Sequence, residues 1–139
     1  MNMRLLVVDD HEMIRVGLRY ALGDAEMEII EATDGLRALE ILFDQHVDLV
    51  LIDVDLPELS GLEVLIRIKQ QRPDLPVLMH SCHDRRAYVA RSFQLGAAGY
   101  LIKSPNATQV VEAVRIALAG GNVWTAAQLR HATNGGAAR

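Results

Sequence analysis

The stretch DLVLIDVDLPELSG, residues 48–61, decides the fold. Its first half is almost continuously apolar between Asp48 and Asp53, which is typical of a strand buried on both faces of a parallel sheet. Its second half contains Pro57 and Gly61, two residues that indicate a loop. The stretch therefore predicts a buried strand that ends at Asp53 and passes into a loop.

Similar units lie on both sides of this stretch. Short β-rich runs at residues 5–8, 28–32, 76–79 and 99–102 alternate with segments of helical period. Residues 11–24 form the first helical segment, and Asp34 is placed as the N-cap of the second. The side chains expected to face inward from these two helices are Ile14, Leu18, Ala21, Leu22, Ala38, Leu39, Leu42 and Phe43.

Three further helices are expected after the central unit. The first runs through Leu62, Leu65 and Ile68, before Pro73, and the second covers residues 84–95 and ends at Gly96, a natural left-handed C-cap. In the third, Asn106 and Gln109 are placed as a capping box, and Gly120–Gly121 is a stop signal. Its core face consists of Val110, Val111, Val114 and Leu118.

Five successive βα units predict one doubly wound α/β domain, with a parallel sheet, helices on both faces and right-handed crossovers. The domain is expected to cover residues 1–121. The tail, residues 122–139, turns into Ala, Gly and polar residues and is too short for a second domain. We expect a fragment of a helix followed by a frayed end there.

Composition excludes several classes of protein. A formal net charge of −4 argues against direct binding of a nucleic-acid backbone by these 139 residues. The single cysteine, Cys82, excludes an internal disulfide framework and fits a reducing compartment. We find neither a signal-peptide pattern nor an apolar run of membrane-spanning length, so a cytoplasmic location is expected.

The unusual polar residues follow the expected strands. Asp9 and Asp10 follow the first strand, Asp53 ends the third, Ser81 follows the fourth and Lys103 follows the fifth. Because ligands of open α/β sheets bind beyond the carboxyl ends of the strands, these residues are expected to meet at one edge.

Such a cluster suits phosphoryl transfer. Three neighbouring carboxylates repel one another unless a cation compensates them, and oxygen ligands with open positions suit Mg²⁺. An aspartate beside a metal can act as a nucleophile and form an aspartyl phosphate, while a lysine and a hydroxyl neutralise the phosphoryl oxygens. Taken alone, Asp9–Asp10 could be a turn and Lys103 a solvated side chain, but Asp53 ends an apolar run in which a charge needs a partner.

Four segments resemble the response-regulator receiver family of two-component systems over about residues 3–121: VVDDHEMIRVGL, DLVLIDVDLPELSGLEVL, PVLMHSCHD and GAAGYLIKS. The resemblance implies a flavodoxin-like strand order of 2-1-3-4-5. It also implies roles for single residues. Asp53 would be the phosphoacceptor, Asp10 a direct Mg²⁺ ligand, Asp9 a ligand through water, and Asp55 a ligand through its backbone carbonyl.

Three other residues match the family's switching and phosphate-binding positions. Ser81 would be the hydroxyl that turns to the phosphoryl group, and Lys103 its cationic partner. Tyr100 matches the aromatic switch that moves inward on activation. From the sequence alone, Tyr100 could equally be a half-buried strand aromatic.

The segments DDHEMIRVGL and KSPNATQVVEAVRIALAGGNVW look more specifically like the NarL/LuxR subgroup, in which a linker and a helix-turn-helix domain follow the receiver. The resemblance implies a sensor histidine kinase as partner and control of transcription by a longer parent protein. DNA would be bound only by the parent's C-terminal domain, which these residues lack. A natural single-domain relative is the alternative. A homodimer would use either the helix 4–strand 5–helix 5 face or the helix 1/helix 5 face.

The sequence departs from the common family pattern at three places. Cys82 stands where a small residue is usual, and simple tolerated packing is the favoured interpretation over an effect on access to Asp53. Ser104 separates Lys103 from the next proline, and a cis bond between the two would be costly. Asp55 and His83 flank the phosphoryl site at variable positions, so we expect them to tune dephosphorylation.

Two other functions compete with this interpretation. Asp53-Val-Asp55 matches the Asp-x-Asp of haloacid-dehalogenase-like phosphatases, but that family carries the motif after its first strand. The other rival is a pseudo-receiver that only docks or dimerises without phosphate. The retained set of Asp9, Asp10, Asp53, Ser81 and Lys103 argues against it. We therefore expect a regulatory phosphoacceptor, which catalyses at most its own phosphorylation and dephosphorylation, rather than an enzyme.

Overall fold

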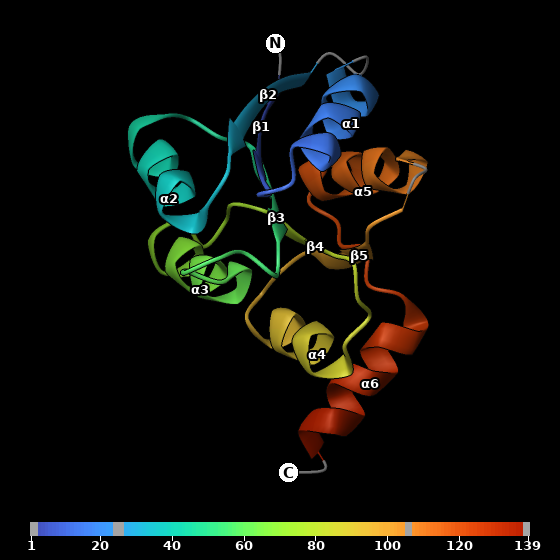
Figure 1. Ribbon diagram of the computed structural model, residues 1–139. Coiled ribbons are helices and arrows are strands. Elements are labelled where there is room, and N and C mark those ends of the chain that lie inside the picture. Colours follow the sequence, from blue (N-terminus) through green and yellow to red (C-terminus); the bar gives the residue numbers. More distant parts are fainter. Residues whose placement is uncertain (1–2, 24–26, 105–106, 138–139) are drawn as a thin grey trace.

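The computed structural model describes residues 3–23, 27–104 and 107–137 of the chain. Strands and helices alternate until a final helix ends the chain (Figure 1). The elements are β1 (Met3–Val8), α1 (Glu12–Gly23), β2 (Met27–Ala32), α2 (Gly35–Asp44), β3 (Leu49–Asp53), α3 (Gly61–Gln71), β4 (Val77–Ser81), α4 (Arg86–Gln94), β5 (Gly99–Ile102), α5 (Thr108–Leu118) and α6 (Ala126–Ala137).

The five strands form one parallel sheet in the order β2-β1-β3-β4-β5. In its register Val8 lies beside Ile52, Asp53 beside His80, and Ser81 beside Ile102. All five residues of β3 are buried, because this strand has a neighbour on each side and helices over both faces. The doubly wound fold and its strand order are thus confirmed.

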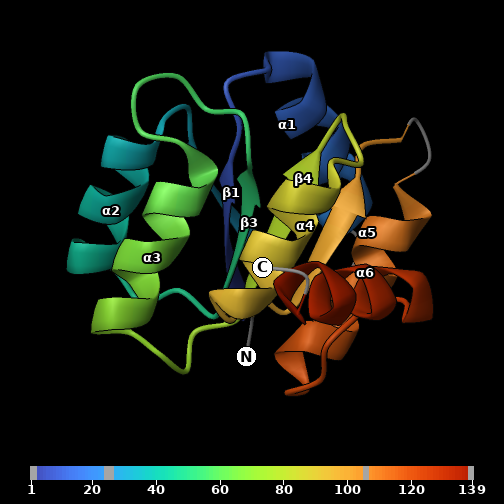
Figure 2. The same ribbon diagram turned by 90° about the horizontal axis from the view of Figure 1, so that it is seen from below.

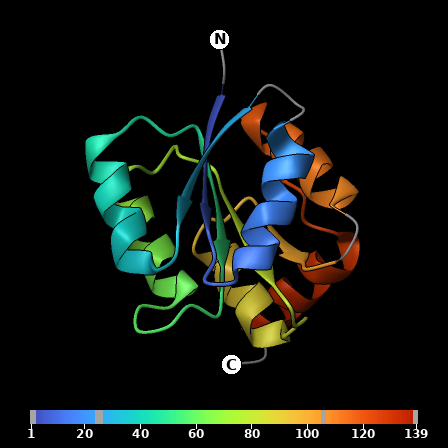
Figure 3. The same ribbon diagram turned by 45° about the horizontal axis from the view of Figure 1, so that its top comes forward.

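Helices cover the two faces of the sheet in two layers (Figures 2 and 3). Leu18 and Leu22 of α1 pack with Val110 and Val114 of α5 on one face. Helices α2, α3 and α4 cover the other face, to which Ile41, Leu65 and Val89 contribute. Apolar side chains of alternating strand residues enter each layer, so each face has its own core.

Local signals in the sequence explain where several helices begin and end. The Asp34 carboxylate accepts a hydrogen bond from the Arg37 N–H at 2.8 Å, which confirms the predicted N-cap of α2. Gly96 ends the α4 segment with a φ of +92°, as expected of a left-handed C-cap. The predicted capping box of α5 depends on Asn106, which lies outside the described residues.

Phe43 corrects one predicted helix face. We expected its ring to point inward, but 87% of the residue is exposed. The buried residues of α2 include Ala38, Ile41 and Leu42. Phe43 follows Leu42 by about 100° around the helix, which turns it away from the sheet. The buried face predicted for this helix was therefore one residue too wide.

Two details after the fourth and fifth strands can be compared with the prediction. Strand β4 extends to Ser81, two residues beyond the predicted run, so this hydroxyl lies at the end of the strand rather than after it. The bond between Lys103 and Ser104 is trans, as no cis peptide occurs in the described part of the chain.

The tail contains the expected helix, and that helix packs against the domain. Helix α6 lies beside α4 (Figures 1 and 2). The Trp124 ring meets Phe93 edge-on at 5.4 Å between centroids, and its Nε1 donates to the Ala97 carbonyl at 3.1 Å. Thr125 and Gln128 form a reciprocal capping box at the start of α6. The tail is therefore docked on the domain at least as far as Ala132, which is buried.

Candidate phosphoryl-transfer site

The topology brings the predicted polar residues to one edge of the sheet. Asp9 directly follows β1, Asp53 and Ser81 are the last residues of β3 and β4, and Lys103 directly follows β5. All four strands are parallel, so their carboxyl ends meet at the same side of the molecule. Residues from four separate segments thus converge, as the sequence predicted.

Lys103 links two of the carboxylates. Its Nζ lies 2.8 Å from Asp9 Oδ2 and 3.0 Å from Asp53 Oδ2. All three side chains are almost completely buried, with 5%, 2% and 1% exposed, respectively. Buried ions require such pairing, because removal from water penalises each charge. The lysine ammonium is the cation that makes two neighbouring buried carboxylates tolerable.

Asp10 and His11 complete the cluster on its solvent side. Single ligand atoms of Asp9, Asp10, His11 and Asp53 all lie within 4.8 Å of one another. His11 Nδ1 is 3.0 Å from Asp9 Oδ1 and 3.3 Å from Asp10 Oδ1. Sequence reasoning missed His11, although its position directly after Asp9–Asp10 was a visible signal.

The pKa directions show how the cluster shares its charge. Burial raises the pKa of Asp53, and the hydrogen bonds from the Asp55 N–H and Lys103 do not fully offset this effect. Burial acts on Asp9 in the same sense, but hydrogen bonds from Lys103 and the His11 N–H hold the pKa of Asp9 below its usual value. The pKa of Lys103 is raised, because its two carboxylates outweigh its burial. The charge on Asp53 is thus the less well compensated of the two buried carboxylates.

This donor set fits a hard divalent cation. The carboxylates of Asp9, Asp10 and Asp53 offer oxygen ligands, and Asp10 leaves the site open to water with 36% of its side chain exposed. Mg²⁺ prefers oxygen ligands and keeps several waters, so an open carboxylate cluster matches its chemistry. The Asp55 side chain is outside this cluster of ligand atoms.

The loop after β3 is held tightly against the site. The Asp55 N–H donates to Asp53 Oδ1 at 2.9 Å and fixes the carboxylate. Gly61 opens α3 and packs so closely on the end of β3 that a Cβ atom there would collide with the Asp53 carbonyl oxygen. Glycine at position 61 is thus required for the loop to return beside Asp53.

Ser81 and Tyr100 are joined through the backbone of His83. The His83 N–H donates to Ser81 Oγ at 3.1 Å, and the Tyr100 hydroxyl donates to the His83 carbonyl at 2.9 Å. Tyr100 is only 2% exposed, so its ring is fully inward and not half-buried. Any displacement of the Ser81 hydroxyl would therefore act on the same backbone segment that holds Tyr100.

The remaining candidate residues lie at the mouth of the site. Asp55 Oδ2 accepts a long hydrogen bond of 3.5 Å from Ser81 Oγ, while its Oδ1 lies 3.9 Å from Arg85. Cys82 is exposed beside Ser81. The side chain of His83 is also exposed, so this residue contributes to the network through its backbone.

No helix in the described ranges is both long enough and apolar enough to cross a bilayer.

The fold and the arrangement of the site residues are those of a class of regulatory domain. The family model of the response regulator receiver domain matches residues 5–115, and the chain belongs to this family.

Individual relatives support the NarL/LuxR-type subgroup. The chain is 42% identical over 120 residues to the transcriptional activator protein ExaE of Pseudomonas putida, covering 85% of this chain and 56% of that protein. It spans about half the length of the curated relatives it matches.

Solved structures are similar in fold. The receiver domain of the putative response regulator NarL from Mycobacterium tuberculosis has a TM-score of 0.78 at 34% identity, with 86% of this chain and 98% of that chain covered. The response regulator TrrA of Thermotoga maritima, solved in complex with Mg²⁺ and BeF, has a TM-score of 0.75 at 33% identity, with coverages of 81% and 96%.

Proposed function

We propose that this domain is a phosphoaspartate switch that receives a phosphoryl group on Asp53 from a sensor histidine kinase. The observation that carries the proposal is the buried pairing of Asp53 with Lys103, at 3.0 Å, beside two further carboxylates. Asp53 is a nucleophile of raised pKa, and Lys103 is a cation already in place to neutralise transferred charge.

Mg²⁺ would be held by Asp10 and Asp53, by Asp9 through water, and by the backbone carbonyl of Asp55. When bound, it supplies charge neutralisation for the phosphoryl oxygens. The solved Mg²⁺–BeF complex of TrrA supports this assignment by similarity.

The bonds that change in the transfer belong to the donor phosphohistidine and Asp53, while Mg²⁺ and Lys103 neutralise charge. A carboxylate oxygen of Asp53 attacks phosphorus while the P–N bond to the donor histidine breaks. The electron pair of that bond stays on the imidazole nitrogen, and the new O–P bond leaves an acyl phosphate on Asp53. Lys103 would stabilise the negative charge that develops in the transfer, because its Nζ already contacts this carboxylate.

Ser81 and Tyr100 would convert the phosphoryl group into a change of shape. We expect the Ser81 hydroxyl to leave its long contact with Asp55 and turn toward the phosphoryl oxygens. The backbone of His83 then carries the change to Tyr100, whose carbonyl accepts a hydrogen bond of 3.0 Å from Gln128 of α6. Helix α6 is the element through which we propose the switch is relayed.

The whole protein is proposed to control transcription, in keeping with relatives such as ExaE. DNA binding would belong to a domain outside this chain. Of the two expected dimer faces, the one formed by α4, β5 and α5 is partly covered by α6. This arrangement favours the α1/α5 face, where Met13 and Tyr20 are each 78% exposed.

Intact mass spectrometry tests the phosphoacceptor. The parent and Asp53→Ala are incubated with Mg²⁺ and acetyl phosphate, and we expect one base-labile phosphate on the parent alone. The Mg²⁺-free reaction is the control. Labelling of both proteins would place the acceptor elsewhere.

The same experiment separates the rival functions. A parent that takes no phosphate from any donor, and dimerises as Asp53→Ala does, would be a docking module. Continuous release of phosphate from a phosphomonoester would instead indicate a phosphatase. Labelling that stops at one phosphate excludes both rivals.

A further inference from the structure

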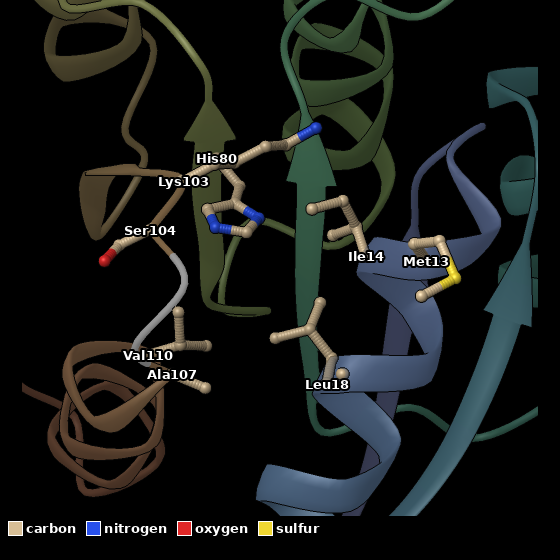
Figure 4. A pocket seen from close by; sticks show the side chains of 9 residues that line it. Met13, Ile14, Leu18, His80, Lys103, Ser104, Ala107 and Val110 are labelled. Carbon is tan, nitrogen blue, oxygen red and sulfur yellow. The ribbon is translucent and has the colours of Figure 1, made fainter.

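A pocket of about 200 Å³ lies between α1 and α5, on the face of the sheet opposite α2, α3 and α4. Figure 4 shows its walls from close by. Apolar side chains from the two helices and the turn before α5 form most of the lining: Met13, Ile14, Leu18, Ala107 and Val110. The β5 side contributes Lys103 and Ser104.

One buried polar group faces this apolar space. His80 lies on β4 and is only 4% exposed, and its ring is turned into the pocket between Lys103 and Val110 (Figure 4). Its Nε2 has no hydrogen-bond partner among the described residues. A buried polar atom without a partner destabilises the fold, so native structures rarely keep one without a reason.

The neighbouring strand positions make this histidine conspicuous. Leu78, two residues earlier on β4, points to the same face and packs in the α1/α5 core. An apolar side chain at position 80 would continue that core without an unpaired nitrogen. Burial and the Lys103 cation lower the pKa of His80 to about 4, so the ring is neutral at pH 7. A neutral ring offers either an N–H or a lone pair at Nε2.

The size and charge of the pocket restrict what it can bind. Cavities of about 150 Å³ accept benzene, whereas drug-sized ligands need about 300 Å³ or more, so one aromatic ring is the appropriate size. A cation would approach the Lys103 ammonium. An anion would gain little, since that ammonium is already paired with Asp9 and Asp53. An uncharged ligand is therefore favoured.

We propose that this pocket binds a small uncharged aromatic molecule that carries one hydroxyl or ring N–H. Its ring would lie against Ile14, Leu18 and Val110, and its polar group would bond to His80 Nε2. The proposal stands apart from phosphorylation of Asp53. Because Lys103 lines the pocket and also contacts Asp53, a bound ring would lie next to the phosphoryl-transfer site.

Nuclear magnetic resonance on the uniformly ¹⁵N-labelled full chain tests the site, with phenol as probe and toluene as its matched control. We expect phenol to shift the His80 Nε2 resonance and the amides of Ile14, Leu18 and Val110. Phenol should bind about three- to tenfold more tightly than toluene, the factor that one additional hydrogen bond supplies.

Two histidine substitutions separate the hydrogen bond from general apolar binding. In His80→Leu the preference for phenol over toluene should disappear, whereas His46→Leu, at an exposed histidine, should keep it. Equal affinity of the parent for phenol and toluene would overturn the proposal. An unmoved His80 Nε2 resonance at saturating phenol would do the same, and this readout needs no variant to fold.

Discussion

At the scale of single residues, the charge of Asp53 is a source of instability in the absence of a metal ion. Its carboxylate is buried, its pKa is raised, and Asp9 and Asp10 lie in the same cluster. Lys103 supplies one positive charge against three negative ones. Under the proposed function the site accepts a cation and a phosphoryl group, and this imbalance is kept at the expense of stability.

The substitution Asp53→Asn should therefore stabilise the metal-free domain. It removes one buried negative charge at nearly constant volume, while Lys103 keeps Asp9 as a partner. We expect the free energy of unfolding to rise by about 1 kcal/mol. Urea titration with a chelator present measures it. A loss of stability would mean that the Lys103–Asp53 contact outweighs the repulsion.

His80 gives the domain a specific dependence on pH. Its pKa is about 4 in the folded state against 6.5 for an ordinary histidine, and the charged groups that act on it are Lys103 and Asp9. Above pH 6.5 the ring is neutral in both states and contributes nothing. As the pH falls from 6.5 toward 4, His80 binds a proton in the unfolded chain but not in the folded one, so the parent loses stability.

The comparison of the parent with His80→Leu isolates this effect from the titration of carboxylates. The difference in the free energy of unfolding between the two proteins should grow by on the order of 3 kcal/mol between pH 6.5 and pH 4, in favour of the variant. Urea unfolding at several pH values measures it. Parallel pH profiles would show that His80 titrates normally in the folded state.

At the scale of elements, α6 is attached to the domain by a few defined contacts. Trp124 packs on Phe93 and donates to Ala97, and Val123 fills the space beside Gly99, where a Cβ atom would collide with it. Gln128 caps α6 with its Oε1 and donates from its Nε2 to the Tyr100 carbonyl. One amide thus joins the start of the helix to the strand that carries the proposed switch residue.

The substitution Trp124→Ala should loosen this helix. It removes the contact with Phe93 and the hydrogen bond to Ala97, so we expect a loss of about 2 kcal/mol in the free energy of unfolding. Hydrogen exchange should become faster in α6 while β3 stays protected. Phe43→Ala, at an exposed aromatic, is the control and should change stability by less than about 0.5 kcal/mol. Unchanged exchange in α6 would contradict the proposed role of the tryptophan.

At the scale of the whole molecule, the proposed Mg²⁺ site would couple stability to divalent cations. A ligand that binds the folded state alone stabilises it by about 1.4 kcal/mol at ten times its Kd. We therefore expect Mg²⁺ to raise the melting temperature of the parent and to do so much less in Asp10→Asn. Differential scanning calorimetry with and without Mg²⁺ measures both. An equal gain in the two proteins would exclude Asp10 as a ligand.

The fold and the positions of the candidate site residues could be predicted because both follow from local patterns. The run that ends at Asp53 identified a buried strand, and parallel topology then placed Asp9, Ser81 and Lys103 at the same edge. These inferences need only the order of elements along the chain. The roles assigned to the residues stay predictions until the mass measurement is made.

The features that escaped prediction depend on distances between elements. The orphan Nε2 of His80 and the docking of α6 beside α4 arise from packing between elements, which periodicity along the chain does not encode. Phe43 was misplaced because its apolar character was used without fixing the angle of the helix. His11 was missed because its side chain folds back onto the two preceding aspartates, Asp9 and Asp10, and the sequence does not show this contact.

The contacts of the tail have one consequence for how the domain meets other copies of itself. Strand β5 ends the sheet, and such strands offer main-chain groups to which a second chain can add. Here the Val123 N–H donates a hydrogen bond to the Ala98 carbonyl at 2.8 Å, and Gln128 Nε2 donates one to the Tyr100 carbonyl. A chain shortened before residue 122 would uncover both acceptors and should aggregate at concentrations where the full chain stays dispersed. We therefore expect the tail to prevent a second chain from pairing with the edge strand β5.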